Sequence, residues 1–153
     1  MLRERISADL KTAMRAKDAR TVSTLRLILA ALKDRDIAAR GGGDDGVISD
    51  ADILKMMQTM VRQRRDSIEL YEKGGRLELA EREAEEIAVI ERYLPAQLDE
   101  AAMREAITAT LADVGASSLK DMGKVMSALR DRHAGQMDFG KAGAIVKEQL
   151  GAG

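Results

Sequence analysis

Apolar residues recur every three or four positions along almost the whole chain, which is the period of an amphipathic α-helix. One apolar stripe runs through residues 2–14, a second through 22–32 and a third through 53–71, and further stripes follow. No stretch keeps the strict apolar–polar alternation of a half-buried β-strand. The pattern therefore predicts an all-α protein.

Residues that favour helix ends lie where these stripes are interrupted. Asp18 is placed to cap the second helix, and Ser49 with Asp52 three positions later resembles a capping box before the third. The composition of residues 41–46 is typical of a glycine-rich loop. A fourth helical stripe extends from Leu77 to Leu94.

Pro95 marks the one clear internal boundary, because a proline inside a helix removes a hydrogen bond and clashes with the preceding turn. We predict an N-terminal domain of long helices over residues 1–94 and a small three-helix domain over residues 95–153. The expected caps and stops of the second domain are Asp99, Gly115, Ser118 with Asp121, Gly135 and Asp138.

Composition narrows the possible classes of protein. Of 153 residues, 45% are apolar and only 2% are aromatic, so the core must be aliphatic. The absence of cysteine excludes disulfides and thiolate zinc sites, and His133 alone cannot form a histidine metal cluster. We expect no metal and no cofactor. No apolar run approaches the length of a membrane span, and the first residues are charged, so we expect no membrane association and a cytoplasmic protein.

Charge is distributed unevenly along the chain. Residues 1–40 contain ten Lys and Arg against five Asp and Glu, whereas residues 66–91 contain three against nine. These two segments could face each other across one bundle, or the basic one could bind phosphates. Residues 117–147 carry six basic and three acidic residues, and the six are Lys120, Lys124, Arg130, Arg132, Lys141 and Lys147.

Few residues form a pattern that could support catalysis. Residues 135–141 match part of a phosphate loop, but Ala142 stands where a magnesium-binding Ser or Thr belongs, and no buried strand precedes them. We therefore predict no catalytic residue. The basic run Arg62–Arg65 is either a salt-bridge hub to the acidic helix or one edge of a binding patch.

Four stretches together have a familiar order and spacing. They are Met14–Asp18 with Thr24–Arg26, Arg62–Ser67 with Tyr71–Arg76, Tyr93–Leu98, and Val114–Ser118 with Lys120–Met126. Their arrangement resembles the GatB/YqeY family, and within it the stand-alone YqeY-type members. The resemblance implies two helical parts. In the larger member of the family, which is part of the glutamine-dependent aminoacyl-tRNA amidotransferase, a similar tail module touches the outer corner of tRNA.

The same resemblance brings a family-level association with carbon–nitrogen ligases that use glutamine as amide donor. That chemistry belongs to a separate domain, which this chain has no residues left to build, so tRNA binding is the transferable property. Gly123–Met126 matches a stretch of the tail domain. The resulting candidates for tRNA contact are Lys120, Gly123, Lys124, Arg130, Arg132 and Lys141.

The sequence thus predicts an accessory tRNA-binding helical protein without catalysis of its own. The contacts would be to phosphates, because sequence-specific RNA readers stack bases on aromatic side chains that this chain almost lacks. The alternative is a helical protein–protein interaction module with a protein partner and no RNA. A free-standing amidotransferase is the third possibility.

Overall fold

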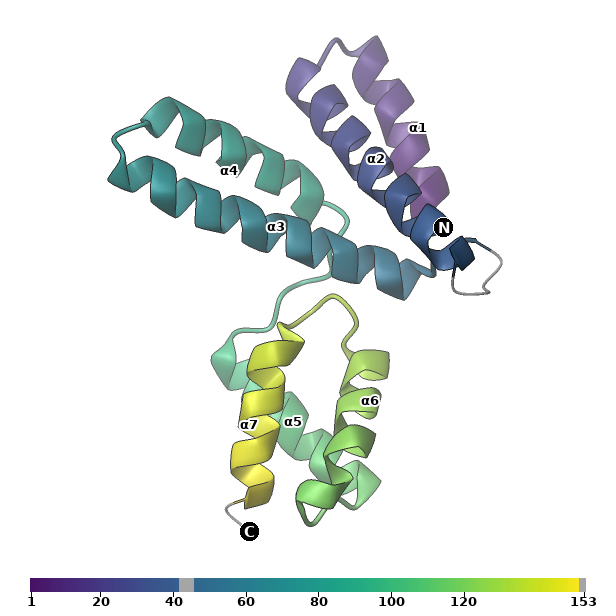
Figure 1. Cartoon of the computed structure of the whole chain (residues 1–153), viewed down its shortest axis with the longest axis vertical. Helices are drawn as coiled ribbons and strands as arrows, with labels where there is room; N and C mark the ends of the chain where they lie inside the picture. Colours follow the sequence, from purple (N-terminus) through teal and green to yellow (C-terminus); the bar gives the residue numbers. More distant parts are fainter. Residues whose placement is uncertain (42–45, 152–153) are drawn as a thin grey trace. The chain divides into compact units, whose positions relative to one another are not determined.

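The computed structural model describes residues 1–41 and 46–151, which contain seven α-helices, one 3₁₀ helix and no β-strand (Figure 1). The all-α prediction is therefore confirmed. The loop expected over residues 41–46 lies mostly outside the described residues. The helices are α1 (Leu2–Arg15), α2 (Ala19–Gly41), α3 (Asp50–Lys73), α4 (Leu77–Glu91), α5 (Glu100–Val114), the 3₁₀ helix η1 (Leu119–Asp121), α6 (Met122–Arg132) and α7 (Phe139–Gly151).

The predicted caps lie at the helix ends. The Asp18 carboxylate accepts hydrogen bonds from the Thr21 amide and hydroxyl at 3.2 and 2.7 Å, which also lowers the pKa of that carboxyl. Ser49 and Asp99 each accept an amide hydrogen bond in the first turn of α3 and α5. Gly115 ends α5 with φ of +67°, a left-handed conformation that favours glycine.

Two helix boundaries differ from the prediction. The Ser118–Asp121 capping box is present, but it opens the short helix η1, and α6 begins only after it. The fourth apolar stripe reaches Leu94, whereas α4 ends at Glu91. The residue before a proline is disfavoured in helical conformation, so the chain leaves the helix ahead of Pro95.

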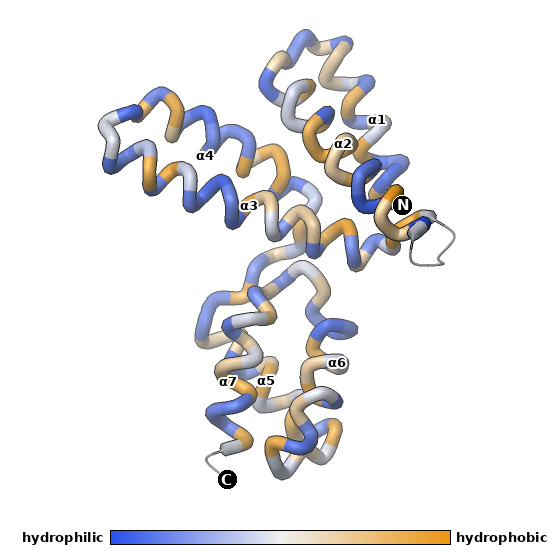
Figure 2. Tube along the Cα trace, viewed as in Figure 1, coloured by the Kyte–Doolittle hydropathy of each residue, from blue (hydrophilic) through white to orange (hydrophobic). Residues whose placement is uncertain are grey.

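The chain divides into two compact units, Met1–Leu94 and Pro95–Gly153, and each is described by itself. In the first unit, α1 and α2 form one antiparallel hairpin, and α3 and α4 form another (Figure 1). Hydrophilic and hydrophobic residues alternate along each helix, as expected for amphipathic packing (Figure 2). The fully buried members of its core are Ile6, Leu25, Ile28, Ile53, Met56, Met57 and Ile90.

Buried Tyr93, just beyond α4, joins that end of the unit to α1. Its hydroxyl donates a hydrogen bond of 2.6 Å to the Asp9 carboxylate, and the Arg5 guanidinium lies 4.9 Å from the ring centre. Burial, followed by the hydrogen bond to Asp9, raises the pKa of the Tyr93 phenol. The contact thus holds the segment just after α4 against α1.

The second unit has its own core between α5, α6 and α7, in which Ile107, Val125, Leu129, Ala142 and Val146 are fully buried. The segment after Pro95 is bound to the turn before α7. The Leu98 amide donates to the Gln136 carbonyl at 2.9 Å, and the Gln97 side chain donates to the Gly135 carbonyl at 2.6 Å.

A second set of long-range polar contacts joins α1, α2 and the segment before α3. The Arg3 guanidinium donates two hydrogen bonds of 2.6 Å to the Asp36 carboxylate, which also accepts the Ile48 amide at 3.0 Å. Arg3 chiefly, and then the Ile48 amide, lower the pKa of Asp36 from 3.8 to about 2. The charged form of this carboxyl is therefore favoured in the folded protein.

We expect Asp36→Asn to reduce stability at neutral pH and to have progressively less effect in acid. A pKa that is lower in the folded state contributes stability that is complete above the unfolded value of 3.8 and is lost as pH falls towards 2. Urea unfolding of wild type and variant between pH 2 and 7 measures this difference. Asp34→Asn is the control, since Asp34 lies exposed on the same helix and has no partner among the described residues. A gap between Asp36→Asn and wild type that stays constant down to pH 2 would contradict this assignment.

Candidate nucleic-acid interface

The six residues predicted to contact tRNA are exposed in the second unit. They comprise Lys120 in η1, Gly123 and Lys124 in the first turn of α6, Arg130 and Arg132 in its last turn, and Lys141 in the first turn of α7. A Cβ at Gly123 would meet nothing within 4 Å, so packing inside the described unit does not require glycine there.

These side chains differ in what they already bind. Arg132 forms an ion pair of 2.7 Å with Asp113 on α5, and the Arg130 guanidinium lies 5.9 Å from the centre of the Phe139 ring. Among residues 1–41 and 46–151, no ion-pair partner is found for Lys120, Lys124 or Lys141. The three lysines are therefore the candidates whose charge remains available.

The six candidates do not share one face. Lys120 and Lys124 are four residues apart, where η1 leads directly into α6. Arg130 is six residues beyond Lys124, which places it about 9 Å further along the helix axis and roughly 240° around it. The structure therefore brings Lys120 and Lys124 together at the start of α6 and separates them from Arg130 at its end.

Asp121 lies between the two clustered lysines, but its carboxylate is already engaged. It accepts hydrogen bonds from the Ser117 and Ser118 amides at 2.9 and 3.2 Å, and these lower the pKa of the carboxyl. The capping box therefore fixes the turn from which Lys120 and Lys124 project.

The partial phosphate-loop pattern before α7 is a helix cap. One Asp138 carboxylate oxygen accepts the Gly140 and Lys141 amides at 2.8 and 3.3 Å. In a phosphate loop such amides would face the ligand. Here an internal carboxylate already binds them.

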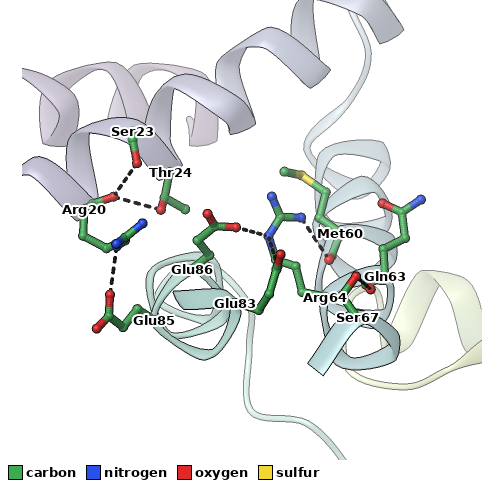
Figure 3. A network of polar contacts seen from close by, with 10 residues as sticks. All are labelled: Arg20, Ser23, Thr24, Met60, Gln63, Arg64, Ser67, Glu83, Glu85 and Glu86. Atoms are coloured by element: carbon green, nitrogen blue, oxygen red, sulfur yellow. Dashed lines mark hydrogen bonds and ion pairs between the residues drawn. The ribbon is translucent and has the colours of Figure 1, made fainter. Parts of the chain in front are cut away.

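The basic run Arg62–Arg65 of α3 forms salt bridges to the acidic helix α4 (Figure 3). This agrees with the interpretation of the run as a salt-bridge hub. Arg64, only 14% exposed, donates to Glu86 at 2.8 Å and to the Met60 carbonyl at 3.1 Å, and its Nε lies 4.0 Å from Glu83. Arg65 pairs with Glu91 at 3.4 Å. The acidic helix α4 thus pairs mainly with α3.

Only one ion pair within the described residues joins the basic segment 1–40 to the acidic segment 66–91, namely Arg20 with Glu85 at 2.8 Å (Figure 3). The interpretation that these segments neutralise each other across the bundle is therefore right for that pair and does not extend to the rest of the basic segment. Most cations of α1 and α2 are left exposed.

Sequence reasoning missed a groove between α1 and α2 with a volume of about 280 Å³. Arg3 and Ser7 line it from α1, and the residues that line it from α2 are Leu29, Leu32, Lys33, Asp36, Ile37 and Arg40. The available signal was the seven-residue spacing of Arg26, Lys33 and Arg40, which repeats one face of a helix.

In residues 1–41 and 46–151, no three His, Cys, Asp or Glu side chains are grouped so that they could hold a metal ion. None of the helices described has the length and apolarity that crossing a membrane requires.

Comparison with known proteins gives a consistent family. The family model described as Yqey-like protein matches residues 3–150. "Altered inheritance of mitochondria protein 41, mitochondrial" from Clavispora lusitaniae is 30% identical over 149 residues, covering 95% of this chain and 82% of that protein. The proteins of the same name from Lachancea thermotolerans and Candida glabrata are 38% and 35% identical, over 58% of this chain and 46% and 47% of theirs.

Except for the Clavispora protein, these matches span about half the length of the relatives. The relatives are named as mitochondrial proteins, so the expected cytoplasmic location, which rested on the charged first residues, is wrong. Neither the family description nor the relatives' names state a reaction. The match across residues 3–150 establishes that this chain belongs to the family of Yqey-like proteins.

Proposed function

We propose that this protein is an accessory tRNA-binding protein without catalysis of its own, and that its second unit contacts the phosphate backbone. The observation that carries the proposal is the cluster of Lys120 and Lys124 at the start of α6, exposed and without ion-pair partners among the described residues. Lysine ammonium groups that form no ion pair can replace the counterions of phosphates.

The aromatic side chains support contact with phosphates over contact with bases. Tyr93 is buried, and partly buried Phe139 lies beneath the Arg130 guanidinium. Both tyrosines, Tyr71 and Tyr93, lie in the first unit. Sequence-specific readers of single-stranded RNA need aromatic faces on which bases stack, and the surface around Lys124 offers none.

The choice of tRNA rests on the resemblance to the tail module of the tRNA amidotransferase. That resemblance supports a binding role beside glutamine-dependent carbon–nitrogen ligases. The catalytic part of that chemistry has no counterpart in these 153 residues. The proposed role is therefore to hold tRNA while another protein performs the reaction.

Reversal of the charge of the clustered lysines tests the proposal. We expect Lys120→Glu with Lys124→Glu to weaken binding of unfractionated tRNA by roughly tenfold or more at low salt. The slope of log K against log salt should become shallower by about 1.4–1.8, at roughly 0.7–0.9 for each of the two phosphates that are no longer bound. Fluorescence anisotropy with labelled tRNA over a salt series measures both quantities.

The matched control is Lys55→Glu with Arg82→Glu, which changes the net charge equally on exposed positions of α3 and α4. Circular dichroism establishes that all variants keep their helix content. Unchanged affinity and slope in the Lys120/Lys124 variant would remove these residues from the interface. Absence of tRNA binding by the wild-type protein at low salt would overturn the proposed function itself.

A second candidate function, binding of another protein, is favoured by two exposed leucines beside the turn between α3 and α4. Leu70 is 69% exposed and Leu77 is 66% exposed. Large apolar side chains in this state often mark contact surfaces. Loss of a purified partner's binding on Leu70→Ser with Leu77→Ser, together with no tRNA binding, would favour this function.

A further inference from the structure

The α1–α2 hairpin holds basic residues that its own carboxylates do not neutralise. Residues 1–40 contain ten Lys and Arg against five Asp and Glu. Four of the five carboxylates already have partners: Glu4 the N-terminal ammonium, Asp9 the Tyr93 hydroxyl, Asp18 the first turn of α2, and Asp36 the Arg3 guanidinium. Only Asp36 of these four binds a Lys or Arg side chain, so the other three leave basic residues unmatched.

The acidic helix of the same unit does not supply the missing partners. Its carboxylates bind Arg64 and Arg65 on α3, and Arg20 alone on α2. In the described parts of the chain, the exposed basic residues of the hairpin without an ion-pair partner are Arg5, Lys11, Arg15, Lys17, Arg26, Lys33, Arg35 and Arg40.

Three of these cations follow one line along α2. Arg26, Lys33 and Arg40 are seven residues apart, which corresponds to about 10.5 Å along the axis with a drift of only about 20° per step. Lys33 and Arg40 line the groove between the helices. Its one lining carboxylate, Asp36, is held by the two hydrogen bonds from Arg3.

The opposite wall of the groove continues the positive charge. Ser7 lines the groove from α1, and Lys11 lies one turn further along the same helix. Residues four apart on a helix lie one above the other on the same side. Lys11 therefore extends the α1 wall next to the cations of α2.

The backbone at Gly46 passes close to the exposed Arg40 side chain. A Cβ on Gly46 would lie 2.4 Å from the Arg40 Cγ and 2.7 Å from its Nε, and Gly46 has φ of +83°. Only glycine allows the backbone to approach the arginine this closely without strain. The aliphatic stem of Arg40 is thus packed beside the groove that its side chain lines.

We propose that the α1–α2 groove is a second RNA-contacting surface, which binds the sugar–phosphate backbone through Lys11, Arg26, Lys33 and Arg40. The inference rests on the proposed function for the identity of the RNA as tRNA, but it concerns a different unit of the protein. A line of separate cations can contact several phosphates of a polymer that carries one negative charge per nucleotide.

The composition of the groove favours RNA over the other anionic partners. Protein interfaces concentrate their binding energy in buried aromatic and arginine anchors, and no aromatic residue lines this groove. Helices that bind in a membrane surface present a broad apolar face. Of the residues lining the groove, Ile37 is the one large apolar side chain that is more than half exposed.

The test is charge reversal at Arg26→Glu with Lys33→Glu in the full chain, measured by tRNA anisotropy over a salt series. We expect affinity to fall by roughly tenfold or more and the salt slope to become shallower by about 1.4–1.8. Lys55→Glu with Arg82→Glu is again the control, and circular dichroism confirms the fold. A neutral pair, Arg26→Gln with Lys33→Gln, should show the same direction of change with a smaller loss.

The outcomes separate this inference from the proposed function. If wild type binds tRNA and Lys120→Glu with Lys124→Glu weakens it, but the α1–α2 variant matches the control, only the groove is excluded. If the α1–α2 variant is weakened and the Lys120/Lys124 variant is not, the groove is supported and the second unit is excluded. Loss of binding to vesicles of anionic phospholipid or to polyglutamate, with tRNA binding intact, would assign the groove to another partner and overturn the inference.

Discussion

Replacement of Leu129 by alanine is expected to lower the free energy of unfolding of the second unit by about 2–5 kcal/mol. Leu129 is fully buried in the core between α5, α6 and α7. The unit spans only Pro95–Gly153, and a core of that size rarely supplies more than about 3–5 kcal/mol. The substitution should therefore leave much of the second unit unfolded at room temperature.

Urea titration with two probes measures this effect. Both tyrosines, Tyr71 and Tyr93, belong to the first unit, so tyrosine fluorescence reports on that unit, whereas circular dichroism reports on all helices. Leu129→Ala should lower the helical signal at zero urea and keep the tyrosine transition. Leu119→Ala is the matched control, because Leu119 is 50% exposed in the same unit and should change stability by less than about 0.5 kcal/mol. Equal effects of the two substitutions would contradict the described core.

Replacement of Arg64 by methionine is expected to destabilise the first unit by roughly 1.5–3 kcal/mol, the range for hydrogen bonds to charged groups. Methionine keeps the aliphatic stem but leaves Glu86, which is only 14% exposed, without its cation (Figure 3). A poorly solvated carboxylate without a partner is costly. The double variant Arg64→Met with Glu86→Leu should recover most of the loss, because no unpaired charge remains.

The control for the hub is the adjacent arginine. Arg65 is 63% exposed and contacts Glu91 at 3.4 Å, so Arg65→Met should cost no more than about 1 kcal/mol. Chemical unfolding followed by tyrosine fluorescence measures all of these variants. A double variant as unstable as Arg64→Met alone would show that the loss arises from packing of the arginine stem and not from its charge.

Local features of the fold could be predicted from sequence because their causes lie within a few residues. Asp18, Ser49 and Asp99 each accept an amide hydrogen bond from three residues onward, which a spacing rule describes fully. Where two rules competed, the prediction was less accurate. The apolar stripe to Leu94 suggested a longer helix than the one that the coming Pro95 allows.

The contacts that hold distant parts together could not be predicted in the same way. Arg3 binds Asp36, and Tyr93 binds Asp9, across 33 and 84 positions. At the candidate interface, the sequence presented Arg132 and Lys124 as equivalent cations. Packing of α5 beside α6 gives Arg132 an ion-pair partner in Asp113, while Lys124 forms no ion pair among the described residues. Which charges stay available depends on tertiary neighbours, and the pattern along one helix contains no record of them.

Several methionine side chains lie in the interior, and their burial determines how easily each can be oxidised. Met56 and Met57 are fully enclosed, and Met137 is almost so, whereas Met14 is 51% exposed. A thioether becomes a polar sulfoxide when peroxide reaches it, and access determines which sulfur reacts first. Exposed Met14 is therefore oxidised with little harm, while the interior sulfurs become vulnerable only when a helix separates from its neighbours. Oxidation of the interior methionines would therefore occur only after a helix has transiently separated. The polar sulfoxides would then prevent that helix from packing back.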